Sequence, residues 1–156
     1  MSGKLEVSFN SPQCGWMSIG FEDGSSEFHT TTSYAPYPNA LADILKGLAS
    51  LIDKRNARDE FVIAWSRNPE EYDLFFQRDG DNINFRVVEY PTLSRSVYES
   101  ETVFTHEGNV TDFCKAFYRT FVQLYEEKSV DEFEFNWHQP FPFREYEEFR
   151  SKITTK

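Results

Sequence analysis

The stretch of residues 60–90 constrains the fold more than any other part of the chain. It begins with an unbroken apolar run, residues 61–65, and continues with two runs that flank Asp79-Gly80. An apolar run of this length is typical of a buried strand, and Asp-Gly favours a tight hairpin because glycine tolerates a positive φ. The sequence therefore predicts three consecutive antiparallel strands.

One side of this predicted meander is apolar. The side chains that share it are Tyr72, Leu74 and Phe76 in the second strand and Ile83, Phe85 and Val87 in the third. Alternation with a period of two places each set on one face of its strand. We therefore expect helices to cover that face.

Two stretches have the apolar spacing of amphipathic helices. The first follows Asn39, a predicted N-cap, and ends near Asp53; the second begins near Asn109, with Asn109 or Thr111 as its cap. Gly47 inside the first helix costs up to about 1 kcal/mol of helix propensity. A close approach of this helix to a strand would explain that glycine.

Further alternating runs at residues 5–9, 16–21 and 27–34 predict three early strands, and residues 97–106 look like an exposed edge strand. We predict an α+β fold with a mostly antiparallel sheet of about six to seven strands, two amphipathic helices packed on one face and a short C-terminal helix. The 156 residues suit a single domain with frayed ends.

Residues 129–153 are predicted to form a partly irregular arm followed by a short helix. Phe133, Phe135 and Trp137 alternate with polar residues, which favours a short strand or an extended arm. Acidic and aromatic residues are interleaved here, as in a surface that binds a basic protein. The candidate partner-binding residues are Glu132, Phe133, Glu134, Phe135, Trp137, Phe141, Glu145 and Tyr146. The alternative is that these aromatic residues belong to the core.

The formal net charge of −10 limits the class of partner. A nucleic-acid binder needs a basic surface, and an anionic membrane would repel this chain, so we expect neither partner. An acidic surface speeds the encounter with a basic protein, although acidity can equally serve solubility. No apolar run reaches the length of a membrane span and the start lacks a secretion signal, so we expect a cytoplasmic protein.

Sequence motifs for catalysis are few. There is no glycine-rich phosphate loop and no nucleophile elbow, and the three histidines are dispersed, so we predict no cofactor and no metal site. One enzymatic alternative remains, in which Cys14 and His29 lie near a pocket of the sheet together with Trp16. A histidine can activate a nearby thiol, but a cysteine in a turn is the simpler interpretation.

Three segments carry a resemblance to small bacterial α+β domains and to immunity proteins that neutralise toxins. They are residues 33–52 (SYAPYPNALADILKGLASLI), 69–87 (PEEYDLFFQRDGDNINFRV) and 140–149 (PFPFREYEEF). The resemblance implies a small acidic protein that blocks a toxin by surface complementarity, and it carries over no site residue.

We therefore expect a non-enzymatic, acidic protein-interaction domain, with an immunity protein for a basic toxin as its specific form. Two alternatives stay open. One is a small enzyme or ligand-binding domain that uses Cys14 and His29, and the other is a homodimer whose sheet edge or aromatic tail is covered by its twin.

Overall fold

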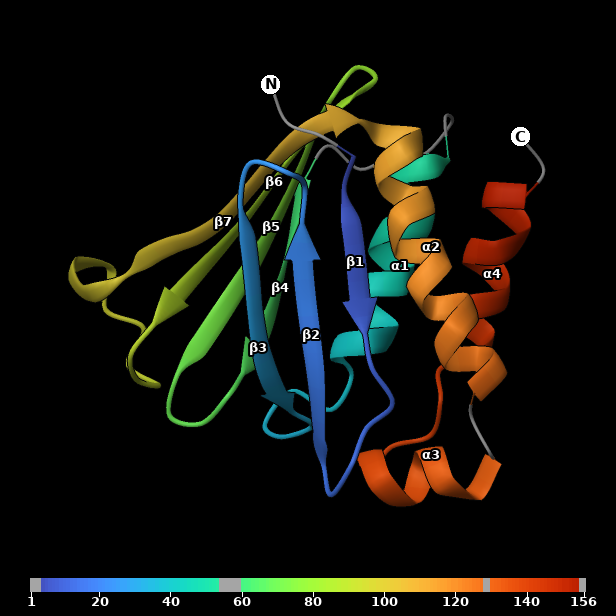
Figure 1. Cartoon of the computed structure of the whole chain (residues 1–156), viewed down its shortest axis with the longest axis horizontal. Coiled ribbons are helices and arrows are strands. Elements are labelled where there is room, and N and C mark those ends of the chain that lie inside the picture. Colours follow the sequence, from blue (N-terminus) through green and yellow to red (C-terminus); the bar gives the residue numbers. More distant parts are fainter. Residues whose placement is uncertain (1–3, 54–59, 128–129, 155–156) are drawn as a thin grey trace.

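A computed structural model describes residues 4–53, 60–127 and 130–154, and seven strands form one antiparallel sheet in sequence order (Figure 1). The strands are β1 (Glu6–Phe9), β2 (Trp16–Glu22), β3 (Glu27–Ser33), β4 (Glu60–Ser66), β5 (Glu71–Asp79), β6 (Asn82–Tyr90) and β7 (Glu101–Asn109). The helices are α1 (Ala40–Ile52), α2 (Val110–Glu127), α3 (Val130–Trp137) and α4 (Phe143–Thr154), with a 3-10 turn, η1 (Val97–Glu99), before β7. The predicted α+β fold is confirmed.

The central meander is β4–β5–β6. Gly80 has a φ of +63° in the β5–β6 turn, which is the conformation for which the sequence predicted a glycine. Phe76 lies opposite Phe85 in the ladder, and both side chains are buried. The last strand was predicted at residues 97–106, but residues 97–99 form η1 and β7 runs over Glu101–Asn109. β7 lies at the edge of the sheet, as predicted.

The first three strands turn across the inner face of the other four. β3 and β4 share one residue pair, Ser33 and Ser66, so the sheet can bend sharply between them. Phe21 of β2 then packs on the rings of Phe85 and Phe104, with centroids 5.1 Å and 5.7 Å apart. The inner face is thus covered by strands as well as by helices.

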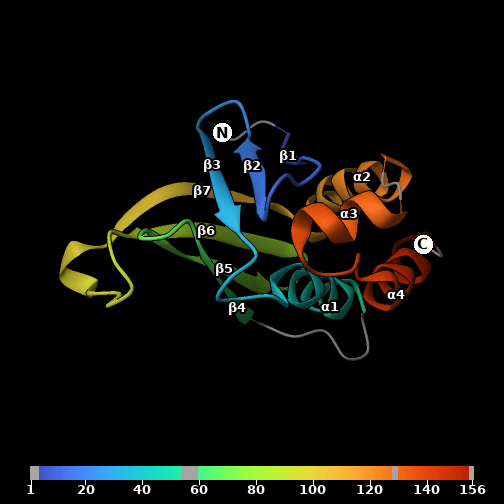
Figure 2. The ribbon, with the colours of Figure 1, turned by 90° about the horizontal axis from the view of Figure 1, so that it is seen from below.

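α1 and α2 lie on this inner face, and α4 lies alongside α1 (Figure 2). Gly47 meets the ring of Phe61 of β4, so the predicted close approach to a strand is confirmed. Asn109 caps α2, because its Oδ1 accepts from the backbone nitrogens of Thr111 and Asp112 at 2.9 Å and 3.1 Å. Asn39 precedes α1 but makes no side-chain capping bond.

The prediction of a short strand or an extended arm around residues 133–137 is wrong, because these residues belong to helix α3. Phe133 and Trp137 lie four residues apart and share the buried side of this helix, whereas Phe135 is 79% exposed. Within the described ranges, no helix combines the length and the apolar character needed to cross a membrane.

Candidate functional site

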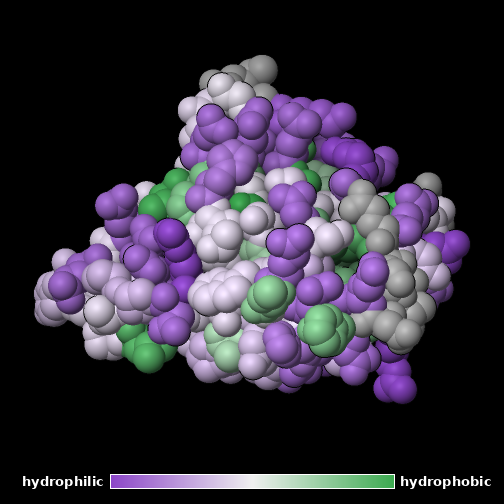
Figure 3. Space-filling model, turned by 60° about the horizontal axis from the view of Figure 1, so that its bottom comes forward, coloured by the Kyte–Doolittle hydropathy of each residue, from purple (hydrophilic) through white to green (hydrophobic). Residues whose placement is uncertain are grey.

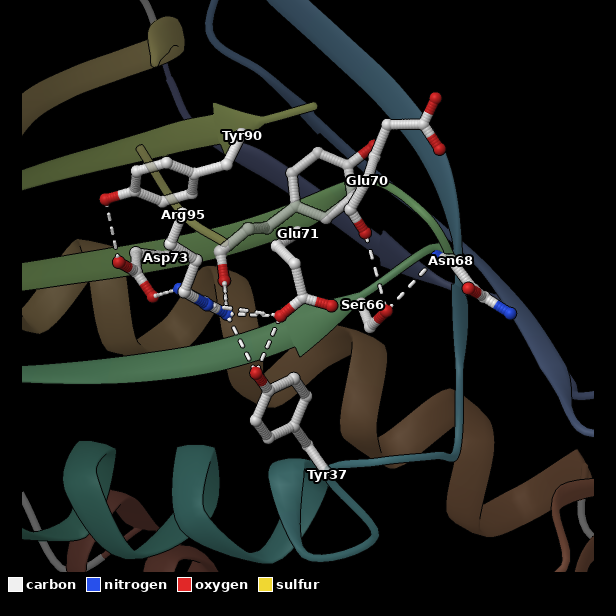
Figure 4. A network of polar contacts seen from close by, with 9 residues as sticks. Tyr37, Ser66, Asn68, Glu70, Glu71, Asp73, Tyr90 and Arg95 are labelled. Atoms are coloured by element: carbon white, nitrogen blue, oxygen red, sulfur yellow. Dashed lines mark hydrogen bonds and ion pairs between the residues drawn. The ribbon is translucent and has the colours of Figure 1, made fainter. Parts of the chain in front are cut away.

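Polar side chains converge on the guanidinium of Arg95, on the outer face of the sheet opposite α2 (Figure 4). Glu71 and Asp73 reach it from β5, Tyr90 from the end of β6, and Tyr37 from the loop before α1. Arg95 lies in the β6–β7 loop, residues 91–100, which turns back toward these strands. Residues two apart on a strand share a face, which is why both carboxyl groups of β5 point at the same guanidinium.

The guanidinium of Arg95 is bonded to both carboxyl groups. It donates from Nε and Nη2 to Oε1 of Glu71, at 3.1 Å and 2.8 Å, and from Nη1 to Asp73. Tyr37 donates to Glu71 at 2.6 Å, and Tyr90 donates to Asp73 at 3.0 Å. Charge-assisted bonds of this kind are stronger than neutral ones, so the network holds the loop firmly.

Glu71 is the most enclosed member of this network. Its side chain is 0% exposed, and Oε2 is the one buried side-chain atom without a hydrogen-bond partner among the described residues. Burial alone would lower the pKa of Arg95, but its bonds to Asp73, Tyr37 and Glu71 raise that pKa above its ordinary value. Burial, together with the bonds to the carboxyl groups, also raises the pKa of both Tyr37 and Tyr90. The bonds from Arg95 to both carboxyl groups thus fix the β6–β7 loop to the sheet.

The loop that Arg95 fixes presents apolar side chains to solvent. Leu93, Val97 and Tyr98 are 63%, 70% and 96% exposed. Glu99 and Glu101 beside them are exposed, whereas Arg95 is turned into the network. The loop forms the projecting lobe at the left of Figure 3, where a hydrophobic patch lies within hydrophilic surface. An anchored apolar tip with acidic neighbours is a candidate interaction surface.

The predicted partner-binding residues of the C-terminal region are divided between core and surface. Phe133, Trp137, Phe141 and Tyr146 are buried in the hydrophobic core. Glu132, Glu134 and Phe135 are exposed on α3, and Glu145 is half-buried in α4. Among the α3 side chains that the structure describes, the exposed ones are thus Phe135 and its acidic neighbours Glu132 and Glu134.

The structure does not bring Cys14 and His29 together. His29 lies opposite Gly20 in the β2–β3 ladder, whereas Cys14 precedes Trp16, which pairs with Ser33 at the far end of the same ladder. The four residue-to-residue steps from Trp16 to Gly20 alone span about 13 Å of strand. His29 instead bonds to the exposed Glu27 at 2.9 Å.

Among the described residues, one group of side chains of the kinds that bind metals lies on the surface. Glu22, Glu27 and His29 place one ligand atom each within 4.8 Å of one another, and all three are exposed. Exposed acidic groups commonly lie this close without an ion, so the cluster carries no assignment.

The fold defines an α+β protein built on an antiparallel meander, with an apolar loop fixed to its outer face. No protein-family profile matches the chain, and neither a curated protein nor a solved structure matches it significantly.

Sequence reasoning missed the β6–β7 loop as a functional candidate. The available signal was the pair Glu71 and Asp73, two carboxyl groups at the same face of a predicted strand. Nothing local in the sequence showed that their partner is Arg95, more than twenty residues away.

Proposed function

We propose that this protein is a non-enzymatic, acidic interaction domain for a basic protein partner. The observation that carries the proposal is Tyr98, which is 96% exposed at the tip of a loop fixed by Arg95. Tyrosine is enriched among the residues that dominate binding energies, and a loop held in place before binding loses less conformational entropy on association.

Charge indicates the chemistry of the partner. The chain has a formal net charge of −10, and the exposed charged residues beside Tyr98 are Glu99 and Glu101. A basic surface with an apolar socket would complement both the tip and its surroundings. An immunity protein for a basic toxin, as the resemblance implies, is one form of this function.

The experiment compares two variants that remove one exposed aromatic side chain each. Tyr98→Ala removes the tip of the β6–β7 loop, and Phe135→Ala removes the exposed aromatic of α3. Each immobilised variant and the wild type are used to capture proteins from the native host at low and at high salt, with mass-spectrometric identification.

We expect wild type and Phe135→Ala to retain the same basic protein at low salt, and Tyr98→Ala to lose at least about tenfold in affinity for it. Salt should weaken the complex, because exposed charges are screened within about 8–10 Å at physiological salt. If Phe135→Ala alone lost capture of the basic protein, the binding surface would lie on α3 instead of on the β6–β7 loop. Capture of no basic protein by any of the three would refute the proposal.

A homodimer is the competing interpretation of the exposed loop tip, and a separate measurement tests it. Light scattering on the purified chain measures its mass directly, and a dimer that Tyr98→Ala dissociates would identify a second copy as the occupant of the loop tip.

A further inference from the structure

A cavity of about 530 Å³ lies between the end of β7 and the first turns of α2. β7 supplies His106 and Gly108, α2 supplies Lys115 and Arg119, and the segment before β1 supplies Lys4. Its volume falls in the range of small-molecule sites. The cavity shares no residue with the Arg95 network.

The lining of this cavity is more basic than the rest of the protein. Lys4, Lys115 and Arg119 face two carboxylates, Glu107 and Asp112, in a chain whose formal net charge is −10. Among the described residues, none of the three cations takes part in an ion pair. Lys115 and Arg119 are four residues apart, so they stand on one side of α2. Cations gathered at a concave surface attract an anion.

His106 adds an oriented imidazole to the cavity wall. Its Nδ1 lies 2.9 Å from Oδ2 of Asp23, a buried residue of the β2–β3 turn. Oδ1 of Asp23 accepts from Ser25 and Ser26, and these bonds, with the one from His106, lower the pKa of Asp23 to about 2 although burial alone would raise it. An ionised Asp23 can only accept, so Nδ1 of His106 carries a proton and donates it. This leaves Nε2 as the nitrogen that can meet a ligand.

Gly108 keeps Nε2 of His106 uncovered. A β-carbon at position 108 would lie 3.1 Å from Nε2, which is closer than ordinary van der Waals contact. The φ of Gly108 does not lie in the left-handed region, so backbone geometry does not require a glycine there. The absence of a side chain at position 108 therefore leaves open space beside the imidazole of His106.

We propose that this cavity binds the phosphate group of a small molecule, with Lys115, Arg119 and Nε2 of His106 as its partners. A phosphate offers several acceptor oxygens in different directions, and it would meet donors from α2 and the N-terminal segment. The guanidinium of Arg119 suits phosphate geometry. With Nδ1 of His106 donating to Asp23, Nε2 can accept from a P–OH group of the phosphate. This proposal does not depend on the protein-binding function of the β6–β7 loop.

The test is a titration of the full chain by two-dimensional NMR at constant ionic strength, with inorganic phosphate, phenyl phosphate and acetate as probes. The variant Lys115→Gln/Arg119→Gln removes two exposed cations and should fold normally. Lys46→Gln, on the exposed side of α1, is the matched control. Asp112→Asn removes a carboxylate from the cavity and should change affinity in the opposite direction.

We expect both phosphate probes to shift the signals of Gly108 and the side chain of His106, and the double variant to weaken binding about tenfold. Lys46→Gln should bind like wild type, and Asp112→Asn should bind more tightly. Preference for phenyl phosphate would identify a phosphate ester as the ligand, and preference for inorganic phosphate would identify the free ion. Acetate binding as tight as phosphate binding would overturn the proposal, as would unchanged affinity in the double variant.

Discussion

The ring of Phe61 occupies the space that a side chain on Gly47 would need. A β-carbon at position 47 would lie 2.3 Å from two atoms of that ring. Phe61 is itself stacked on Phe76, with ring centroids 4.3 Å apart, so it cannot simply move aside. Gly47 thus marks a place where α1 and β4 come too close together for a side chain on the helix.

Gly47→Ala should destabilise the protein although alanine favours helices. The helix gains about 1 kcal/mol of propensity, but overpacking a well-packed core costs about 1–3 kcal/mol. We expect a net loss of free energy of unfolding, measured by urea denaturation. Lys46→Ala, at an exposed position of the same helix, should change stability little. A more stable Gly47→Ala variant would show that Phe61 can repack.

Arg95→Ala should free the β6–β7 loop and lower stability. It leaves Glu71 buried with Tyr37 as its remaining donor, and an uncompensated buried carboxyl group costs about 2 kcal/mol or more. Hydrogen exchange of residues 91–100 should accelerate in the same variant. Arg86→Ala is the control. Arg86 is exposed, and its Cζ lies 4.2 Å from the centroid of the Phe75 ring, outside the Arg95 network. Equal effects of the two substitutions would contradict the role of the network.

The pair Asp23–His106 predicts a loss of stability in acid. The pKa of Asp23 is lowered from 3.8 to about 2, so its ionised form stabilises the fold above about pH 4. This contribution, about 2 kcal/mol, is lost as the pH falls from about 4 to about 2. Asp23→Asn should therefore be less stable at neutral pH and should lose less stability between pH 4 and pH 2. Parallel stability curves for the two proteins, measured by urea denaturation, would refute this assignment.

The two thiols should differ in reactivity. Burial raises the pKa of Cys114 to about 12, whereas Cys14 lies exposed in a turn. Iodoacetamide near neutral pH should therefore modify one cysteine in the folded protein and both in denaturant, because the thiolate is the reactive form. Mass spectrometry counts the labels, and Cys14→Ser should remain unlabelled while folded. Labelling of Cys114 in the native state would indicate that α2 opens.

Patterns with a short range in sequence predicted most of the fold. Asp79-Gly80 marked its hairpin because one residue with a positive φ decides the turn, and the apolar spacing of α1 and α2 marked helices that cover a sheet. The C-terminal prediction failed because Phe133, Phe135 and Trp137 fit two periods. They alternate as in a strand, yet Phe133 and Trp137 are also four apart, and tertiary packing favoured the helix.

The candidate sites depend on contacts that no local pattern contains. Arg95 meets Tyr37 across 58 positions, and His106 meets Asp23 across 83. These pairs arise from the bend between β3 and β4 and from the return of the β6–β7 loop, which depend on the whole core. Exposure of Tyr98 and burial of Phe141 likewise follow from the complete packing rather than from either residue's neighbours.

The single pairing of Ser33 with Ser66 divides the backbone hydrogen bonds of the sheet into two groups. Strands β1–β3 form one group and β4–β7 the other, and each is densely bonded within itself. Such groups open as separate cooperative units, so we expect the amides of β1–β3 to exchange with solvent at their own common rate. Exchange of all seven strands at one common rate would show instead that the shared core couples the two groups.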